Sequence, residues 1–287
     1  MAHRAGFVGL GNIGKPMAKR LVQGGLETTV YDIDDAPVRE LALLGAKRAA
    51  SPRELAAASD SIGICVRDDA DVRQAVYGDF GLLAGAAPGS VIAIHSTVLP
   101  QTVEEVAAAA AERDVGVIDA CITGGAGGAE QGELTYMVGG DARHLERCRP
   151  AFETSARKIV HAGALGNGAR VKLCNNLMTY LAWTAAYEGA ALARAIGLPQ
   201  EVLEEVTRSN GILSEPMQRF LAIHKLPDEA RRSEDMQRVL RGHVALAEKD
   251  LAWTLQLARE AGVALPGTEL ASQIMARVYG LEDENRR

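Results

Sequence analysis

The first half of the chain alternates short apolar runs with segments of helical spacing. The apolar runs have the length and composition of strands buried on both faces, and the segments that follow most of them repeat apolar positions every three or four residues. A strand followed by a helix, repeated in this order, predicts a parallel, doubly wound sheet. The strands are predicted at residues 5–10, 27–31, 61–66, 90–94, 115–120, 134–138 and 158–161.

The helices predicted between these strands differ in how clearly the sequence marks their ends. Helix 51–55 has the strongest signal, because Ser51 can cap its first turn, Pro52 fits the first helical position and Glu54 completes a capping box. The other helices of this half are predicted directly after Gly14 and at 39–44, 71–77, 102–113 and 142–152.

Beyond residue 164 the sequence predicts helices only. The longest runs from residue 168 to 196, contains no proline, and ends where Gly197 and Pro199 follow. At 1.5 Å per residue it is roughly 43 Å long, enough to leave one domain and enter another. We therefore expect a Rossmann-type α/β domain at 1–164 and an all-helical domain at 165–287. The other helices are predicted at 200–209, 215–223, 244–261 and 270–279.

The first turns of the long helix carry a polar stripe. Its members are Lys172, Asn175, Asn176 and Thr179. Their spacing places them on one helical face, and a lysine beside two amides is unusual on a helix that packs against its neighbours. The alternative is a solvated edge on which Lys172 is an ordinary surface lysine.

Composition and charge narrow the functional classes. Hydrophobic residues make up 47% of the 287 positions and aromatic residues only 4%, so aliphatic side chains must build the core. The 31 basic and 37 acidic residues give a net charge of −6, which disfavours nucleic acid as a partner. No apolar run reaches the ~18 residues of a membrane helix, and we expect neither a membrane span nor a signal peptide.

The four cysteines show neither a C-x-x-C pair nor the spacing of metal ligands. They are Cys65, Cys121, Cys148 and Cys174. Scattered thiols of this kind fit a reduced, cytoplasmic setting and predict no metal site. Cys174 adjoins the polar stripe, and we interpret it as a small packed residue rather than a nucleophile, because no histidine lies in its segment.

A glycine pattern joins the first predicted strand to the first helix. Gly9, Gly11 and Gly14 form the G-x-G-x-x-G sequence in which backbone amides at a helix start bind the pyrophosphate of a dinucleotide. Asp32 ends the second strand 18 residues after Gly14, close to the ~20-residue spacing of an acid that binds the ribose hydroxyls. This acid favours NAD over NADP, because a 2′-phosphate would meet its charge. The alternative is an ordinary strand–turn–helix in which Asp32 is a turn residue.

A second glycine-rich segment, residues 121–129, follows the predicted strand 115–120. It contains four glycines in five positions directly after Thr123. A loop with bare backbone amides and a hydroxyl can surround a carboxylate, whereas composition alone also fits a flexible surface loop. His95, Ser96 and Thr97 end the strand 90–94, at the edge where ligands of such sheets bind.

Taken together, these motifs resemble the β-hydroxyacid dehydrogenase family, of the 3-hydroxyisobutyrate dehydrogenase type. The resemblance runs nearly end to end. It rests on the glycine pattern with Met17 and Ala18, on Ser96-Thr97 with Pro100, on Asp119-Ala120 with Thr123-Gly124-Gly125 and Gly128-Ala129, on Gly166 and Gly168 with Lys172, Asn175 and Asn176, and on Lys249-Asp250-Leu251.

The resemblance implies roles for individual residues. Lys172 would be the catalytic residue with Asn176 beside it, and Thr123 would complete the catalytic set. Thr123, Gly124 and Gly125 would hold the substrate carboxylate. The substrate set would be Thr123, Gly124, Gly125, Lys172, Asn175 and Asn176. The cofactor set would be Gly9, Gly11, Asn12, Ile13, Gly14, Asp32, Val66, Arg67, Asp71, Thr97 and Lys249, with Thr97 by the nicotinamide and Lys249 reaching the cofactor from the helical domain.

The expected activity is hydride transfer between NAD and the hydroxyl carbon of a short 3-hydroxy acid, a small carboxylate substrate. The alternatives are a reductase of a short semialdehyde acid of the glyoxylate, succinic or tartronate type, an imine reductase, and a non-catalytic nucleotide-binding protein. Imine-reducing relatives typically lack the lysine, so Lys172 counts against the second of these. The resemblance also implies a homo-oligomer, a dimer or a tetramer, assembled through the helical domain.

The chain departs from the family pattern near the expected substrate pocket. Thr123 stands where serine is usual, Cys121 where proline is usual, and Val66-Arg67 where a Leu-Pro pair is usual. The stretch 227–241 matches no family motif, and its mixed charges over 229–241 predict a solvated segment. These differences leave the cofactor motif and Lys172 intact and bear on the choice of substrate.

Overall fold

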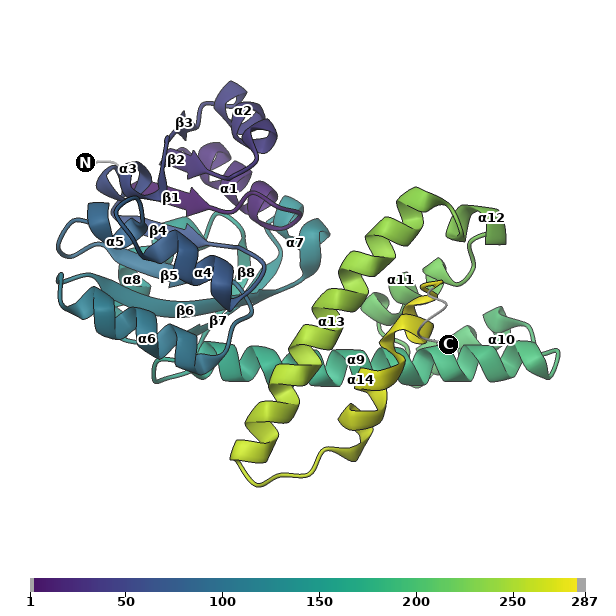
Figure 1. Cartoon of the computed structure of the whole chain (residues 1–287). Coiled ribbons are helices and arrows are strands. Elements are labelled where there is room, and N and C mark those ends of the chain that lie inside the picture. The colour runs from purple at the N-terminus through teal and green to yellow at the C-terminus, as the bar shows by residue number, and fades with distance from the viewer. Residues whose placement is uncertain (1–2, 283–287) are drawn as a thin grey trace. The chain divides into compact units, whose positions relative to one another are not determined.

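The computed structural model describes residues 3–282 and divides the chain into two compact units, Met1–Lys172 and Leu173–Arg287. The first unit is an α/β domain and the second is helical (Figure 1). The α/β class followed by a helical domain is therefore confirmed. The division between the units falls inside one continuous helix, and each unit is described by itself below.

Within residues 3–172, eight strands form one sheet in the order β3-β2-β1-β4-β5-β6-β7-β8. Their bounds are β1 Arg4–Val8, β2 Glu27–Tyr31, β3 Lys47–Arg48, β4 Ser61–Ile64, β5 Val91–Ile94, β6 Gly116–Thr123, β7 Leu134–Gly139 and β8 Ala156–His161. Neighbouring strands are parallel, with Phe7 of β1 opposite Gly63 of β4, except that β7 is antiparallel to β6. A fully parallel sheet was thus the wrong expectation at this pair. The reason is the short link 124–133, because a parallel crossover needs roughly a dozen residues or more.

Eight helices of the first unit, within the described residues, connect these strands. Their bounds are α1 Gly14–Gln23, α2 Asp35–Leu43, α3 Pro52–Ala57, α4 Asp69–Val76, α5 Leu82–Gly85, α6 Pro100–Ala111, α7 Gly125–Gln131 and α8 Ala142–Phe152. The predicted cap of α3 is present, since the Ser51 hydroxyl accepts from the Glu54 amide at 3.2 Å. The Glu54 carboxylate accepts from the amide of Ala50 rather than from that of Ser51, so the reciprocal half of the capping box is displaced by one residue.

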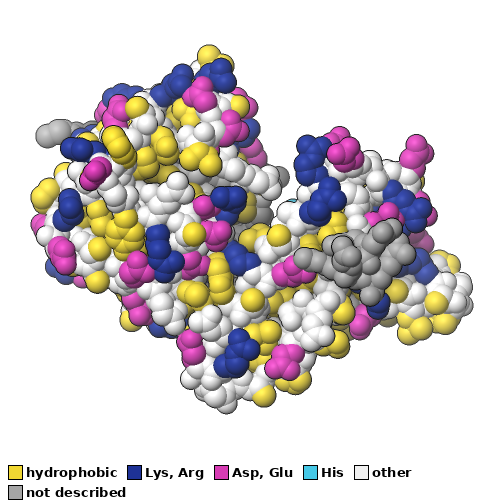
Figure 2. Space-filling view, viewed as in Figure 1, with side chains coloured by type: hydrophobic (Ala, Val, Ile, Leu, Met, Phe, Trp, Pro, Cys, Tyr) yellow, Lys and Arg dark blue, Asp and Glu magenta, His cyan; other side chains and the backbone are white. Residues whose placement is uncertain are grey.

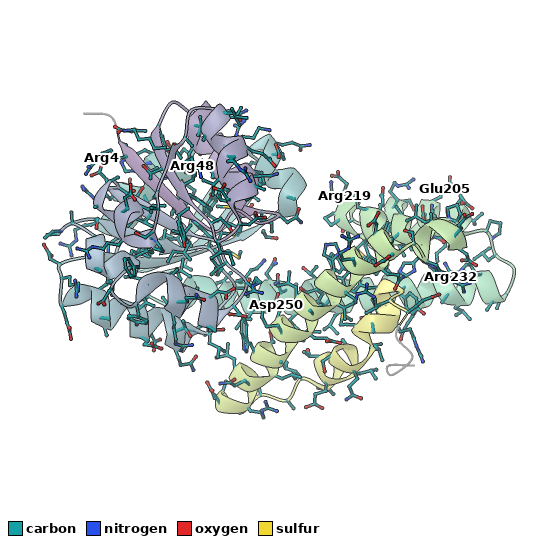
Figure 3. All side chains as sticks on the ribbon, turned by 45° about the horizontal axis from the view of Figure 1, so that its top comes forward. Arg4, Arg48, Glu205, Arg219, Arg232 and Asp250 are labelled. Atoms are coloured by element: carbon teal, nitrogen blue, oxygen red, sulfur yellow. The ribbon has the colours of Figure 1, made fainter. Side chains whose placement is uncertain are left out.

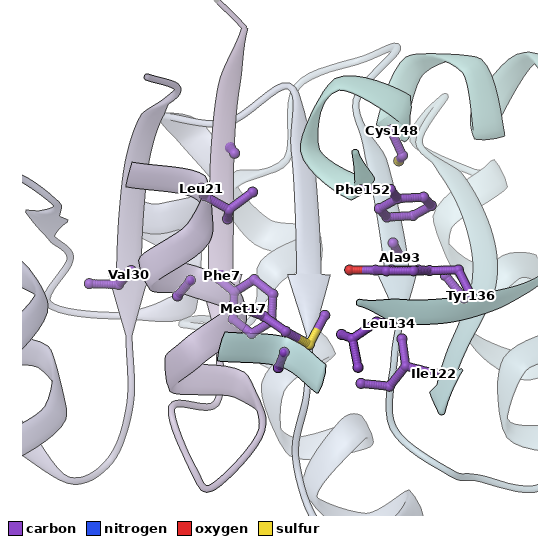
Figure 4. Close-up of a cluster of buried hydrophobic side chains, with 14 of the residues drawn as sticks. Phe7, Met17, Leu21, Val30, Ala93, Ile122, Leu134, Tyr136, Cys148 and Phe152 are labelled. Carbon is purple, nitrogen blue, oxygen red and sulfur yellow. The ribbon is translucent and has the colours of Figure 1, made fainter. Parts of the chain in front are cut away.

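The sheet separates two hydrophobic cores, as the alternation along a strand requires. Ala93 of β5 faces the core that contains Met17 and Leu21 of α1, whereas its neighbour Ile94 faces the core beneath α3 to α6. Figure 4 shows the first core, in which Phe7, Met17 and Tyr136 lie close to the strands. Burial of the strands on both faces explains why they read as continuous apolar runs in the sequence.

The segment 121–129 is not the loop that its glycines predicted. Residues up to Thr123 continue β6, and Gly125–Gln131 form α7. Ala129 of α7 is fully buried in the first core, and Gly132 ends the helix in the left-handed conformation. Tertiary packing therefore overrides the low helix propensity of glycine.

The second unit is built around α9, Asn167–Ala195, which begins in the first unit. The other helices are α10 Gln200–Ser209, α11 Glu215–Ile223, α12 Asp228–Arg231, α13 Glu234–Glu260 and α14 Pro266–Tyr279. Their core includes Tyr180 of α9 with Phe220 and Leu240. Leu240 shows that the charged stretch 229–241 is only partly solvated. Among residues 3–282, none of the helices combines the length and hydropathy that crossing a membrane would require.

Two helix starts in the second unit differ from the sequence prediction. The helix α13 begins ten residues earlier than expected, at Glu234 instead of Val244, because Ser233 caps it by accepting from the Met236 amide at 3.3 Å. The helix α14 begins four residues earlier than expected, at Pro266 instead of Leu270, because proline fits the first helical turn.

Candidate functional site

The turn between β1 and α1 has the shape of a phosphate-binding loop. Gly9 has φ +90°, and a Cβ there would lie 2.3 Å from the carbonyl oxygen of Cys65. A Cβ on Gly14 would lie 1.9 Å from the Gly9 carbonyl oxygen, so the fold itself requires both glycines. A Cβ on Gly11 would meet nothing within 4 Å. The open side of Gly11 is therefore free for a ligand to approach the backbone.

The start of α1 fits the phosphates of a dinucleotide. Its N-cap is Ile13, which offers no side-chain hydrogen bond, whereas Asp34 caps α2 and Asp68 caps α4. Amides that no side chain caps, beside a glycine with an open side, are suited to bind an anion. Asn12 and Ile13 lie at this helix start, as expected.

Asp32 follows β2 and is fixed beside the glycine loop. One carboxylate oxygen accepts from the Leu10 amide, and the other accepts from the Asp34 amide at 2.8 Å. Each oxygen keeps further acceptor capacity, which matches a ribose diol that donates two hydrogen bonds. The loop and the acid are thus brought together as the sequence predicted.

The ends of β4 and β5 contribute the neighbouring edge. The Val66 amide donates to the Ser96 hydroxyl at 2.8 Å, which joins the two strand ends immediately before Thr97. Arg67 forms a two-point ion pair with Asp71, at 2.7 and 3.1 Å, and this pairing lowers the pKa of the Asp71 carboxyl. Val66, Arg67 and Asp71 thus form one local group at the carboxyl edge of the sheet.

Lys172 lies beside the end of β6. Its Nζ donates to the carbonyl oxygen of Ile122 at 2.7 Å, and Thr123 is the next residue. Gly124 and Gly125 follow with φ +128° and +66°, conformations that favour glycine. The first unit therefore places the Lys172 amino group at the strand end from which Thr123 and the glycine turn follow, although Lys172 and Ile122 are fifty residues apart in sequence.

Asp119 of β6 holds the start of α9 and thereby positions Lys172. Its side chain is fully buried, and its two oxygens accept from the amides of Gly166 at 2.8 Å and Ala169 at 2.7 Å. A Cβ on Gly168 would lie 2.4 Å from the Met137 carbonyl oxygen, so the helix start is in close contact with β7. Burial raises the pKa of the Asp119 carboxyl, and the backbone amides oppose that rise.

The asparagines lie in the second unit, on the turn of α9 after Lys172. The Nδ2 of Asn176 donates to Asp250 Oδ2 at 2.6 Å, and Asn175 Nδ2 donates to Asn176 Oδ1 at 3.2 Å. Asp250 is buried in α13, and Figure 3 labels it there. Lys249 Nζ lies 3.5 Å from Asp250 Oδ1 and 4.2 Å from the centre of the Trp253 ring.

Sequence reasoning missed two functional candidates, Asp119 and Asp250. Both were noted as parts of motifs without a role. For Asp119 the available signal was a single acid inside an otherwise apolar strand, because a buried carboxylate needs partners. Within residues 3–282, no group of three His, Cys, Asp or Glu side chains could hold a metal ion.

A glycine turn with an open side, followed by a carboxylate at the end of the second strand, defines a dinucleotide-binding oxidoreductase class of fold. The model for the NAD binding domain of 6-phosphogluconate dehydrogenase matches residues 4–163. The model described as NAD-binding of NADP-dependent 3-hydroxyisobutyrate dehydrogenase matches residues 166–285. The chain belongs to the β-hydroxyacid dehydrogenase family and is an NAD(P)-dependent dehydrogenase of CH–OH groups.

Individual relatives cover most of the chain. An NAD-dependent L-serine dehydrogenase of Pseudomonas aeruginosa is 39% identical over 70% of this chain and 68% of its own. A 2-(hydroxymethyl)glutarate dehydrogenase of Eubacterium barkeri is 32% identical over 98% and 92%. The solved structure of a Mycobacterium tuberculosis 3-hydroxyisobutyrate dehydrogenase with L-serine superposes with a TM-score of 0.81, at 28% identity over 98% and 94%.

Proposed function

We propose that this protein transfers hydride between NAD and the hydroxyl carbon of a short 3-hydroxy acid, with Lys172 as the general acid/base. The observation that carries the proposal is the 2.7 Å hydrogen bond from Lys172 Nζ to Ile122, directly before Thr123. This contact supports an amino group held at the end of β6, directly before the residues that would bind the substrate. The reverse reaction, reduction of the corresponding semialdehyde acid, uses the same groups.

The proposed mechanism follows from where the protons must go. A bound nicotinamide supplies the hydride acceptor. Lys172 acts as the neutral amine: it takes the proton from the substrate hydroxyl as hydride leaves the carbon, and the Ile122 carbonyl accepts a hydrogen bond from the ammonium that results. Asn176, one turn later on α9, is proposed to orient the reacting groups, with Asn175 bracing the helix.

We place the substrate carboxylate at Thr123, Gly124 and Gly125. The positive φ angles of both glycines let consecutive amides turn toward one ligand, and the Thr123 hydroxyl adds a third donor. These three hydrogen-bond donors also supply the local attraction for an anion that the net charge of −6 makes necessary.

The relatives' names suggest the shape of the substrate. L-serine, 3-hydroxyisobutyrate and 2-(hydroxymethyl)glutarate all carry a CH₂OH group on the carbon next to a carboxylate. We propose the same arrangement for this chain's substrate. Thr123 in place of serine adds one methyl group beside the carboxylate and would narrow the pocket at that point.

For the cofactor we propose NAD, bound by Gly9, Gly11 and Gly14 through the phosphates and by Asp32 through the ribose. The remaining contacts, from Asn12, Ile13, Val66, Arg67, Asp71, Thr97 and Lys249, stay part of the proposal. We assign cofactor binding to residues 1–164, and substrate binding and assembly to residues 165–287.

The test is a panel of hydroxy acids with NAD, followed by the absorbance of NADH. We expect turnover with acids that carry the HO–CH₂–CH–COO⁻ arrangement, and far slower reaction when the carboxylate is replaced by an amide or a methyl group. Equal rates with a simple alcohol of the same length would remove the carboxylate site from the proposal.

We further propose that the protein is a homo-oligomer, a dimer or a tetramer, assembled through its helical unit. The apolar positions of α10 share one face, as on a helix that packs against a partner. Within the described residues, however, none of the side chains of α10 is buried. Val202 and Val206 are 47% and 56% exposed, and Ile196 at the end of α9 is 69% exposed. Figure 2 shows hydrophobic side chains gathered over this end of the second unit. Light scattering after gel filtration measures the subunit number, and a monomer would contradict the proposal.

A further inference from the structure

Asp250 combines full burial with an uneven set of hydrogen bonds. It is 1% exposed. Its Oδ2 accepts from two side chains, Asn176 Nδ2 at 2.6 Å and the Tyr180 hydroxyl at 3.2 Å. Its Oδ1 is buried without a hydrogen bond, and the Lys249 ammonium 3.5 Å away supplies charge but not that bond. A buried carboxylate with an unpaired oxygen destabilises a fold, so its presence here calls for another reason.

The pairing with Asp250 fixes which way the Asn176 amide points. A carboxylate only accepts hydrogen bonds, so the NH₂ group of Asn176 must face it. The amide oxygen then lies on the opposite side, where Asn175 Nδ2 reaches it at 3.2 Å. That oxygen has two lone pairs, and one is left for a further donor. Asn176 is 8% exposed, so its amide has little freedom to turn.

We propose that Asp250 is a positioning residue which orients the Asn176 amide so that this asparagine serves the reaction as a hydrogen-bond acceptor. The inference rests on the proposed role of Lys172 as general acid/base. Asn176 lies four residues after Lys172 on α9, on the same helical face. An acceptor on this face stabilises the ammonium that forms when Lys172 takes the hydroxyl proton, whereas an NH₂ group there would oppose it.

The first experiment removes the charge without changing the shape. Asp250→Asn offers Asn176 both a donor and an acceptor, so the amide is no longer held one way round. With L-serine or 3-hydroxyisobutyrate and NAD, we expect kcat to fall about 10- to 100-fold, as when the outer partner of a site residue is lost. The KM for NAD reports separately on Lys249, the proposed cofactor contact 3.5 Å from Asp250 Oδ1, so the fall in kcat is the measure of the Asn176 amide. An unchanged kcat would overturn the inference.

A matched control lies one turn further along α13. Thr254 is buried, and its hydroxyl donates to the Asp250 backbone carbonyl at 2.8 Å. Thr254→Val removes a buried hydrogen bond from the same helix and leaves the carboxylate and the Asn176 amide in place. We expect its kcat to stay within about twofold of wild type. A fall in kcat equal to that of Asp250→Asn would show that the role of Asp250 is purely structural, and it would overturn the inference.

An exchange of the two residues separates acceptor from donor. In the double variant Asn176→Asp with Asp250→Asn, position 176 is a carboxylate, which can only accept, and the pair keeps its charge and volume. We expect it to regain about tenfold of the activity lost in Asp250→Asn. The single variant Asn176→Asp, in which two carboxylates face each other, should be poorer than the double variant. A double variant no better than Asp250→Asn would show that the NH₂ group is what the reaction uses.

A spectroscopic measurement reads the orientation without turnover. With ¹⁵N-labelled asparagine, the side-chain NH₂ signal of Asn176 is assigned by its loss in Asn176→Asp. We expect this signal to be protected from exchange in the wild type and to lose that protection in Asp250→Asn. Lys172→Ala is assayed in parallel. Full activity of Lys172→Ala contradicts the proposed function, whereas an unprotected Asn176 amide in the wild type contradicts the present inference alone.

Discussion

Asp119 and Asp250, the buried aspartates among residues 3–282, hold two different turns of the same helix in different ways. Asp119 in the first unit gives both oxygens to backbone amides, at 2.8 and 2.7 Å from Gly166 and Ala169. Asp250 in the second unit accepts from side chains only, on one oxygen, and leaves the other without a hydrogen bond. A carboxylate bound to backbone fixes where a helix begins, whereas one bound to side chains fixes how a functional group points.

The contrast has a functional meaning only if Lys172, which lies between the two held turns, carries out the proton transfer. We expect Lys172→Ala to lower kcat by ~10²–10⁴, the usual contribution of a positioned acid or base. NAD affinity, measured by fluorescence titration, should barely change, because Gly9, Gly11 and Asp32 are untouched.

Lys172→Arg is the matched control for charge. Arginine keeps the cation but cannot release its proton near neutral pH, so it should be nearly as inactive as alanine. A variant without Lys172 that binds NAD and keeps most of its turnover would leave both aspartates with structural roles only.

The backbone-held side of the comparison is tested by Asp119→Ala. This change leaves two buried amides, of Gly166 and Ala169, without their acceptor, and we expect a loss of about 2–4 kcal/mol in the free energy of unfolding. kcat should fall as well, because the turn that carries Lys172 is no longer fixed. Urea unfolding monitored by circular dichroism gives the first quantity and the NADH assay the second.

Asp69 provides the comparison residue for this test. It accepts from the Leu99 amide at 3.0 Å and from the Thr102 hydroxyl at 2.6 Å, and so ties the start of α6 as Asp119 ties that of α9. Asp69→Ala should lower stability without a matching loss of kcat. Equal losses of kcat in the two variants would mean that Asp119 acts through general stability and not through Lys172.

His95 extends the comparison to a buried base, whose charged form is a cation and not an anion. His95 is enclosed by Phe7, Tyr136 and Phe152, and its Nδ1 shares a 2.8 Å hydrogen bond with the Ala120 carbonyl. Burial lowers the pKa of His95 to about 4, from 6.5. Because the folded-state pKa is the lower one, the stabilisation is complete above pH 6.5 and is lost as the pH falls toward 4.

We expect this group to remove about 3 kcal/mol from the free energy of unfolding over that range. The measurement is urea unfolding at a series of pH values between 7 and 4, for wild type and for His95→Phe. The variant lowers stability at pH 7 by losing the bond to Ala120, but it should flatten the acid dependence. An equally steep dependence in the variant would assign the acid sensitivity to other groups.

Local signals predicted most of the fold. Helices α8, α10 and α11 and strand β2 have the predicted bounds, because each is marked by period and by flanking turn residues. The errors arose where distant contacts decide the structure. The glycines after Thr123 fold as α7 because Ala129 is buried in the core, and the two-residue strand β3 and the short helix α5 are too brief to show a period.

The candidate site was predicted unevenly for the same reason. The glycine turn and Asp32 are close in sequence and in space, and the sequence was sufficient to pair them. Lys172 and Ile122 are fifty residues apart, and Asn176 and Asp250 seventy-four, so no spacing rule could connect them. The resemblance assigned roles to Lys172 and Asn176, and it included both carboxylates in its motifs without assigning them a role.

Cofactor choice is the smallest effect and concerns a third carboxylate, which is held by backbone amides like Asp119. We expect kcat/KM to favour NAD over NADP by roughly 10- to 100-fold, because a 2′-phosphate would meet the charge of Asp32. A larger ratio is not expected. Asp35 is paired with Arg39 at 3.0 Å and with Arg48, so it adds little negative field, and these guanidinium groups would partly offset the repulsion.

Asp32→Ala should therefore lower the ratio of kcat/KM for NAD to that for NADP. The main cause is weaker binding of NAD, since the ribose diol loses its acceptor. Arg48→Ala leaves the diol contacts in place and should raise the ratio by removing a cation near a 2′-phosphate. For each variant, the ratio is obtained by measuring kcat/KM for NAD and for NADP at a fixed substrate concentration. Equal wild-type values for the two cofactors would show that a carboxylate fixed by the Leu10 and Asp34 amides does not exclude the phosphate. The rigidity that this aspartate shares with Asp119 would then have no part in cofactor selection.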